Sequence, residues 1–411
     1  MADLKAMIEQ ADDPLLSKDA ALTRTRERAM REATLLAEQR KIAFDVEQRE
    51  EIDTAIGWRA EELAGRPVAT DEDGNEIYDP TRLELAANFF QTARGERTPI
   101  DQHHQKFLAM SQVKPRTLAD DIRSMKLLKK WCQKAGVPPY LQTLTKREAV
   151  RFCDELPTMT EKLTPVTLNK TISRLSVYWT WLENRHEVDA NIWKGRRLKE
   201  PAQTSDQKER PFTEDEMKAL LGGEAVPEMH DLMRIAALTG ARLDAIVCLR
   251  VKDCRDDGVF VFKPQKKEPG PRLCPIHSDL KEIVTRRTKD KTPDDDIFPE
   301  WPGVKKAGSL RERSFKTSNQ FTEYRRSVHV DDQLEGKRRG LVNFHSFRRW
   351  FITKAEQAGQ PESTIAVVVG HKRTGMTFGV YSAGPLLEQA RLCVEAVKLP
   401  AFKKATGGGH D

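Results

Sequence analysis

The chain has 411 residues, 69 Lys and Arg against 63 Asp and Glu, and a formal net charge of +6. Its length accommodates two or three domains. Hydrophobic residues make up 38% and charged residues 32%, and no stretch approaches the roughly 18 to 20 apolar residues that span a bilayer, so a membrane protein is excluded. The small charge excess permits a nucleic-acid partner but does not identify one.

The N-terminal region, residues 1–97, is predicted to be a largely helical extension. Residues 1 to about 65 are rich in Ala, Glu, Arg and Gln, which are good helix formers. The turn-forming cluster in RPVATDEDGNEIYDP predicts a short hairpin over residues 66–80. The start, MADLKAMIEQADD, has no apolar core behind basic residues, so we expect no signal peptide. Six cysteines without CxxC spacing argue against structural zinc and disulfides, and favour the cytoplasm.

Residues 98–193 are predicted to form a helical bundle. The segment RTLADDIRSMKLLKKWC places apolar residues on one helical face, namely Leu118, Ile122, Met125 and Cys132. The segment VTLNKTISRLSVYWTWLENR has apolar residues at steps of 4, 3, 4 and 3, which indicate one long amphipathic helix: Leu168, Ile172, Leu175, Trp179 and Leu182. The neighbours His103 and His104 point to opposite sides of any helix or strand, so we expect them at the surface and not at a metal site.

Residues 194–211 are predicted to be a basic interdomain linker. The segment is polar and lacks apolar periodicity, and its first basic residues are Lys194, Arg196, Arg197 and Lys199. Two interpretations stay open: an ordinary solvated linker, or a tether that lies along a phosphate backbone.

Residues 212–400 are predicted to form a second domain, followed by a flexible tail over 401–411. Thr213 and Glu216 form a capping box at its first helix, and Gly240 suits the left-handed end of a later one. The spacing of apolar residues then changes to a period of two in GVFVFK and RLCPI. Because these two segments flank a turn-rich stretch, they predict a β-hairpin. Helices resume to the end, so we expect a mainly α chain with a small β-sheet (α+β).

The residues that could carry chemistry are basic or polar and lie in this second domain. The chain has no GxxxxGK[ST] loop, no GxGxxG after a strand, no HExxH and no carboxylate cluster for magnesium, so we expect neither a cofactor nor a metal. The candidates share positions beside turns or on one helical face: Arg242, Lys266, Lys267, His345, Arg348, His371 and Tyr381.

Three segments resemble the tyrosine recombinase (phage integrase) family: TGARLDAIVCLR around Arg242, HSFRRWFI around His345 and Arg348, and VVGHKRTGMTFGVYS around His371 and Tyr381. The lysine-bearing hairpin lies between the first two, as in the family. The resemblance covers about residues 213–398, and the bundle at residues 98–193 is similar to the family's core DNA-binding domain.

The resemblance implies a site-specific recombinase that cleaves and rejoins double-stranded DNA. Arg242 and Arg348 would clamp the scissile phosphate, which suits the planar guanidinium fork, and Tyr381 would attack it to give a 3′-phosphotyrosyl bond. His345 would act as a base or hydrogen-bond partner, and His371 would donate to a phosphate oxygen. Lys266, or alternatively Lys267, would protonate the leaving 5′-oxygen.

The resemblance also implies self-association on DNA, as a tetramer in the synapse, with the amphipathic helix in PLLEQARLCVEAVKL docking on a neighbouring protomer; packing on its own domain is the alternative. Residues 1–97 could contact DNA or a protomer. A type IB topoisomerase-like enzyme and a non-catalytic DNA-binding regulator remain alternative functions.

Two positions depart from the family pattern. The acidic residue expected three positions after the first arginine is replaced by Ala245, with Asp244 one position earlier. The residue after the second arginine, often His, is Arg349, which we expect to be exposed.

Overall fold

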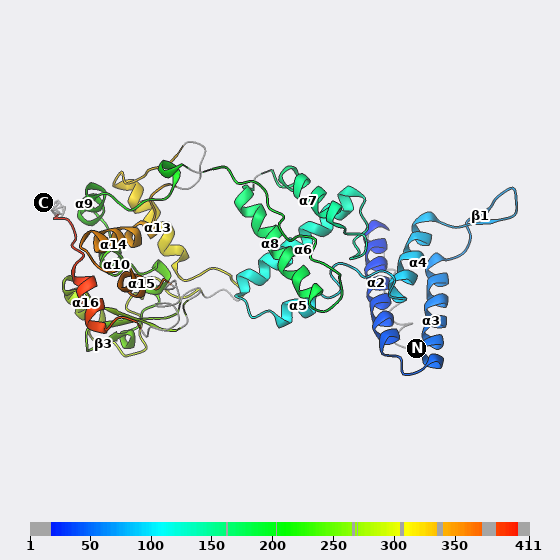
Figure 1. Cartoon of the computed structure of the whole chain (residues 1–411), viewed down its shortest axis with the longest axis horizontal. Coiled ribbons are helices and arrows are strands. Elements are labelled where there is room, and N and C mark those ends of the chain that lie inside the picture. The colour runs from blue at the N-terminus through cyan, green and yellow to red at the C-terminus, as the bar shows by residue number, and fades with distance from the viewer. Residues whose placement is uncertain are drawn as a thin grey trace. The chain divides into compact units, whose positions relative to one another are not determined.

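The computed structural model describes residues 18–161, 163–202, 204–264, 268, 270–304, 308–334, 340–371 and 384–401. The chain divides into two compact units, Met1–Pro201 and Ala202–Asp411, each considered by itself below (Figure 1). Helices dominate both units and each has one small antiparallel sheet, which confirms the predicted α+β class. Within the described ranges, no helix is both long and apolar enough to cross a membrane.

The first unit begins with three helices that pack around a small core of their own. They are α2 (Lys18–Ile42), α3 (Val46–Ala64) and α4 (Pro80–Ala93), which lie side by side in Figure 1. The core is built largely from alanines with a few larger side chains, among them Ala29, Ala33, Ile56, Leu63, Leu85 and Phe89. The predicted hairpin is confirmed as β1 (Ala69–Thr70) paired antiparallel with β2 (Glu76–Ile77).

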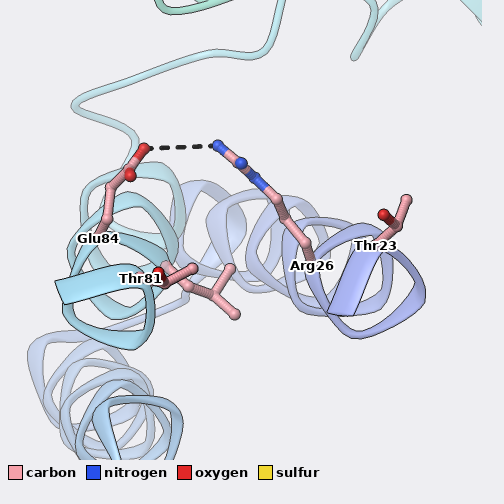
Figure 2. Close-up of a pocket in the computed structure, with 5 residues that line it drawn as sticks. Thr23, Arg26, Thr81 and Glu84 are labelled. Carbon is pink, nitrogen blue, oxygen red and sulfur yellow. Dashed lines mark ion pairs between the residues drawn. The ribbon is translucent and has the colours of Figure 1, made fainter. Parts of the chain in front are cut away.

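A pocket of about 100 Å³ lies between α2 and α4 and is lined by Thr23, Arg26, Thr81, Glu84 and Leu85. Figure 2 shows Arg26 and Glu84 reaching toward each other across it, with Arg26 Nη2 3.6 Å from Glu84 Oε1. Both side chains are more than half exposed. An exposed ion pair of this kind contributes little stability, and the pocket has no group with catalytic chemistry.

The rest of the first unit is the predicted helical bundle, with α5 (His104–Met110), α6 (Pro115–Ala135), α7 (Lys146–Met159) and α8 (Pro165–Glu183). All five residues of the predicted α8 stripe are at most 2% exposed, which confirms it. Trp131, Phe152 and Trp193 meet edge to face at centroid separations of 5.5 and 5.4 Å. Edge-to-face contacts add to the free energy of burial, so this aromatic chain ties the segment after α8 to α6 and α7.

The predicted apolar face of α6 is wrong at one position. Ile122 is 40% exposed, whereas its neighbour Asp121 is 3% exposed. The reason is an ion pair with α8: Arg174 Nε lies 2.5 Å from Asp121 Oδ1, and its Nη2 lies 2.8 Å from Oδ2. The two-point bond satisfies the buried carboxylate and turns α6 so that Met125, Leu128 and Trp131 follow it into the core.

The surface position predicted for the two histidines is also wrong. His104 is 7% exposed and packs edge-on against Tyr178, with ring centroids 5.2 Å apart. The His103 side chain is 13% exposed, and its Nε2 lies 3.4 Å from Glu187 Oε2. Burial lowers the pKa of both rings. They are therefore structural groups at the start of α5, which the sequence spacing alone could not reveal.

The segment after α8 is held by α8 itself as far as Glu200. Asn169 accepts a hydrogen bond from Leu198 N at 2.8 Å and donates one to Glu200 Oε1 at 2.8 Å. Arg197 Nη2 donates to the same carboxylate oxygen at 2.8 Å. These contacts order residues 198–200, and the boundaries predicted for the domains and the linker stay predictions.

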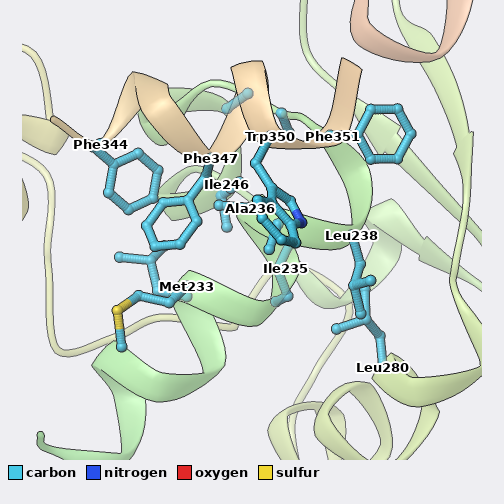
Figure 3. Close-up of a cluster of buried hydrophobic side chains, with 14 of the residues drawn as sticks. Met233, Ile235, Ala236, Leu238, Ile246, Leu280, Phe344, Phe347, Trp350 and Phe351 are labelled. Atoms are coloured by element: carbon cyan, nitrogen blue, oxygen red, sulfur yellow. The ribbon is translucent and has the colours of Figure 1, made fainter. Parts of the chain in front are cut away.

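The second unit contains eight α-helices within its described residues, around one large core. They are α9 (Glu214–Gly222), α10 (Pro227–Thr239), α11 (Leu243–Val247), α12 (Lys281–Thr288), α13 (Ser314–Ser327), α14 (His345–Gln357), α15 (Glu362–Val369) and α16 (Leu387–Glu395). The predicted capping box of Thr213 and Glu216 is confirmed at α9. Figure 3 shows the aromatic face of α14, with Phe344, Phe347, Trp350 and Phe351, lying over the apolar side chains of α10.

The sheet of this unit has the order β3-β4-β5. The predicted hairpin is confirmed as β4 (Val259–Phe262) and β5 (Arg272–Pro275), with Phe262 opposite Arg272. The third strand, β3 (Cys254–Arg255), is too short to show a period of two and was not predicted. The register of β4 and β5 places Arg272 at the end of the strand pair, opposite the last residue of β4.

The C-terminal helix α16 packs on its own unit. Its buried residues are Ala390, Cys393 and Val394, while Leu387 and Leu392 are 37% and 60% exposed. The apolar stripe thus serves the core of the second unit, and two leucines remain on the solvent side of the helix.

Candidate active site

Arg242 is positioned by the end of α10. Gly240 adopts φ 60° and caps this helix in the predicted left-handed conformation. An added Cβ at Gly240 would lie 2.9 Å from both Phe351 Cδ1 and Val369 Cγ1, so glycine is required for close packing as well as for φ. The turn places Arg242 at the start of α11, where its side chain is 32% exposed.

Arg348 lies on the buried side of α14, with the residue only 1% exposed. Its Nη1 donates to the carbonyl oxygen of Gly240 at 2.9 Å, which ties α14 to the same turn that presents Arg242. Its Nε and Nη2 have no hydrogen-bond partner among the described residues. A buried guanidinium with two unsatisfied nitrogens costs free energy, so the geometry provides two donors ready for an anion.

The charges around Arg348 affect its pKa. Burial, together with the positive charges of Arg242 and Arg272 and against the opposing effect of Glu268, lowers the pKa of Arg348 to about 9. A pKa depressed in this way indicates cations held together at a distance where they repel. A bound anion would relieve that repulsion.

The two histidines lie at the edges of this group and are accessible to solvent. His345 begins α14, and its pKa is lowered to about 4 by desolvation and by the charges of Arg349 and Arg348. His371 follows Gly370, which ends α15 at φ 74°, and desolvation together with Arg348 and Arg242 lowers its pKa. Both rings are therefore neutral near pH 7 and can accept or donate a proton.

Two charged groups of the site were not predicted. Glu268 Oε1 lies 2.6 Å from Arg242 Nη1, and its side chain is only 6% exposed. Arg272 is 7% exposed, its guanidinium lies 4.6 Å from the centre of the Phe262 ring, and its Nη1 donates to the carbonyl oxygen of Val368. Its Nε and Nη2 lack a hydrogen-bond partner within the described part of the chain.

The two departures from the family pattern have structural explanations. Asp244 accepts a hydrogen bond from Ser314 N at 3.2 Å, so it caps α13, and Ala245 is 2% exposed in the core. The exposure predicted for Arg349 is wrong: its side chain is 28% exposed and its Nη2 lies 2.7 Å from Glu209 Oε2.

The chain that enters the second unit is fastened to the first turn of α14. We call this set of bonds the entry clasp: Arg349 with Glu209, Arg210 N donating to Leu341 O at 3.0 Å, and Ser346 Oγ donating to Arg210 O at 2.8 Å. The Arg210 guanidinium also bridges Glu216 and Asp332, each at 2.8 Å. The clasp therefore holds the helix that carries His345 and Arg348.

The remaining candidates, Lys266, Lys267 and Tyr381, lie outside the described residues. Among the candidates that are described, Arg242, His345, Arg348 and His371 come together, because each histidine is influenced electrostatically by both arginines. Four cationic or neutral basic side chains from three separate segments thus lie within electrostatic range of one another. This arrangement is typical of a site that binds and polarises a phosphate.

The comparisons with known proteins agree with this class of fold. The chain is similar to the solved structure of the Tn1549 transposon integrase in complex with circular intermediate DNA, with 16% identity, a TM-score of 0.50, and coverage of 72% of this chain and 98% of that one. It is also similar to the lambda integrase dimer bound to a COC′ core site, with 16% identity, a TM-score of 0.50, and coverage of 77% and 93%. The fold is thus that of the integrases.

One family model matches part of the sequence. The model described as the phage integrase family matches residues 211–384. This part of the chain is therefore similar to the phage integrase family, in agreement with the resemblance of its motifs. No curated protein matches the chain in sequence at a significant level.

Proposed function

We propose that this protein is a site-specific tyrosine recombinase that cleaves and rejoins double-stranded DNA to integrate or excise a mobile element. The observation that carries the proposal is Arg348, a buried cation with two unsatisfied nitrogens, held beside Arg242 through the turn at Gly240. Both solved neighbours described above are integrases bound to DNA, and the match to the phage integrase family covers all the proposed catalytic residues.

In the proposed reaction the hydroxyl oxygen of Tyr381 attacks the scissile phosphorus. A Tyr–O–P bond forms, the bond to the 5′-oxygen breaks, and the leaving oxygen takes a proton from Lys266, with Lys267 as the alternative donor. Arg242 and Arg348 bind the non-bridging oxygens, whose negative charge grows in the transition state. The phosphotyrosyl bond conserves the energy of the phosphodiester, so a free 5′-hydroxyl rejoins the strand by the reverse attack without ATP.

The two histidines complete the assignment. His345, whose pKa is lowered to about 4, is neutral at working pH and can accept the proton of Tyr381. His371 donates a hydrogen bond to a phosphate oxygen. The basic residues Lys194, Arg196, Arg197 and Lys199 are proposed to contact the DNA backbone, and the exposed leucines of α16 to contact a second protomer in a synaptic tetramer.

The test is a nicked suicide duplex that traps the covalent intermediate on a denaturing gel. We expect wild-type protein to form a covalent protein–DNA adduct in the presence of EDTA, and Tyr381→Phe to form none, because phenylalanine lacks the attacking oxygen. The phosphotyrosyl bond should appear at a 3′ end, with a free 5′-hydroxyl on the other product.

The outcomes separate the competing functions. An adduct that persists in Tyr381→Phe would refute the assignment of the nucleophile. Relaxation of supercoiled DNA without exchange between two partner duplexes would favour a type IB topoisomerase-like enzyme. Sequence-specific binding without any adduct would favour a DNA-binding regulator.

A further inference from the structure

Glu268 is the acidic group at the centre of the cationic site. It comes from the segment between β4 and β5, far in sequence from α11 and α14, and its Oε1 lies 2.6 Å from Arg242 Nη1. A Cβ added at Gly370 would collide with Glu268 Oε1 and lie 2.8 Å from Arg272 Nε. The carboxylate is therefore lodged beside the end of α15, between Arg242 and Arg272.

The charges that face Glu268 are mostly positive. Its charge influences the pKa of Arg348, Arg272 and His371, and in each case it opposes the lowering caused by burial and by the arginines. Three arginines from different elements repel one another in a poorly solvated place. One carboxylate among them offsets part of that repulsion and allows the set to stay charged and close together.

The bond between Glu268 and Arg242 engages only one terminal nitrogen of the guanidinium. It occupies Nη1 of Arg242, as the carbonyl of Gly240 occupies Nη1 of Arg348. Each guanidinium is thus anchored through one terminal nitrogen, and within the described residues no bond engages its Nε–Nη2 edge, which can make a two-point bond to a phosphate. An anchored fork loses less conformational entropy on binding than a free one.

No acidic residue close to Arg242 in sequence is available to hold its guanidinium. Asp244 is engaged with the backbone of Ser314, and the next position is Ala245, which is buried in the core. We propose that Glu268 is the positioning residue that holds Arg242 in its phosphate-binding orientation, in place of an acidic residue on α11. This inference rests on the proposed recombinase function.

The experiment compares Glu268→Gln with wild type in single-turnover cleavage of the nicked duplex, with the dissociation constant measured separately by fluorescence anisotropy. We expect cleavage at saturating DNA to fall by about 10- to 100-fold, because a mispositioned transition-state donor costs rate, while the dissociation constant changes less than threefold. Glu268→Asp keeps the charge but shortens the reach, so we expect it to be slow as well.

The pH profile gives a readout that a purely structural role would not move. Without the negative charge of Glu268, the pKa of Arg348 falls further below its value of about 9. Cleavage requires protonated Arg348, so the alkaline limb of the profile should shift to lower pH in Glu268→Gln. Glu268→Asp should retain the wild-type limb.

Asp231→Asn is the matched control. Asp231 is another buried carboxylate bonded to arginine, 2.6 Å from Arg287 Nε with 5% of its side chain exposed, and it lies outside the site. We expect this variant to lose stability but to keep the wild-type cleavage rate per folded molecule and the wild-type alkaline limb.

Cleavage by Glu268→Gln at the wild-type rate would overturn the inference. Cleavage faster than wild type would also overturn it and would show that the carboxylate competes with phosphate. If Glu268→Gln does not fold, a wild-type rate in Glu268→Asp overturns it equally. These results leave the proposed function intact as long as the adduct still depends on Tyr381. Failure of the wild type itself to form an adduct would instead refute the function.

Discussion

Arg348 is the residue at which stability and the proposed function oppose each other most directly. Its pKa of about 9 in the folded protein lies well below the ordinary value of an arginine. The unfolded chain therefore binds this proton more tightly than the folded chain, so the charge on Arg348 destabilises the fold at neutral pH. Phosphate binding would recover this free energy.

Replacing this buried charge should stabilise the free protein. We expect Arg348→Met to raise the free energy of unfolding at pH 7 by about 1–3 kcal/mol, because it removes a desolvated cation with unsatisfied donors. Adduct formation should be lost in the same variant. Urea unfolding followed by circular dichroism measures the first effect, and the suicide duplex measures the second.

Anion titration supplies the control for that prediction. Inorganic phosphate should raise the melting temperature of the wild type more than that of Arg348→Met. A Met variant that is less stable than wild type would mean that packing around the guanidinium stem outweighs the cost of its charge.

At the residue scale, the arginines and histidines could be proposed from the sequence because each lies in a short segment that resembles a family motif. Glu268 lies in no such segment: a single acidic residue in the turn-rich segment QKKEPGP is typical of a solvated loop. The only signal in the sequence was Ala245, which stands where the family pattern has an acidic residue and so indicated that another carboxylate approaches Arg242. The sequence did not indicate which one.

The pairing of α6 with α8 shows how an element's orientation depends on a contact across the core. Asp121 takes a core position because Arg174, 53 residues away, satisfies its carboxylate. Hydrophobic periodicity ranks Ile122 as the inward residue, since it assigns no partner to an acidic side chain. The helix itself was predictable, but its rotation was not.

Removal of this carboxylate should destabilise the bundle. We expect Asp121→Ala to lower the free energy of unfolding by about 1–3 kcal/mol, because Arg174 loses both charge-assisted bonds. Asp120→Ala is the matched control: Asp120 pairs with Arg123 on the exposed side of the same helix, and such a pair contributes about 0–1 kcal/mol. Equal losses in the two variants would remove the special role of Asp121.

The whole molecule contains two compact units, and hydrophobic cores that do not span both. Residues of the second unit's core run from Phe212 to Val397, and those of the bundle from Ile100 to Trp193. The sequence places a basic stretch without periodic apolar residues between these two cores, and the domain boundaries drawn from it stay predictions. It could not predict the separate alanine-rich core at Ala29–Ala93, since small residues give a weak hydrophobic pattern.

Because the two units have separate hydrophobic cores, we expect them to unfold at separate temperatures. We expect two transitions in scanning calorimetry, with Arg348→Met raising the transition of the second unit and Asp121→Ala lowering that of the first. Each variant should leave the other transition within about 1 °C of its wild-type position, because distant substitutions act independently. A single transition that shifts in both variants would contradict this expectation.

The entry clasp has a mechanical consequence. Glu209 and Arg210 are bonded to Arg349, Leu341 and Ser346, so tension along the incoming chain reaches the first turn of α14 before it reaches the apolar core. That turn bears His345, and Arg348 follows one turn later. A force applied to the chain before Glu209 would thus be transmitted to the Arg348 guanidinium through the few hydrogen bonds of the entry clasp.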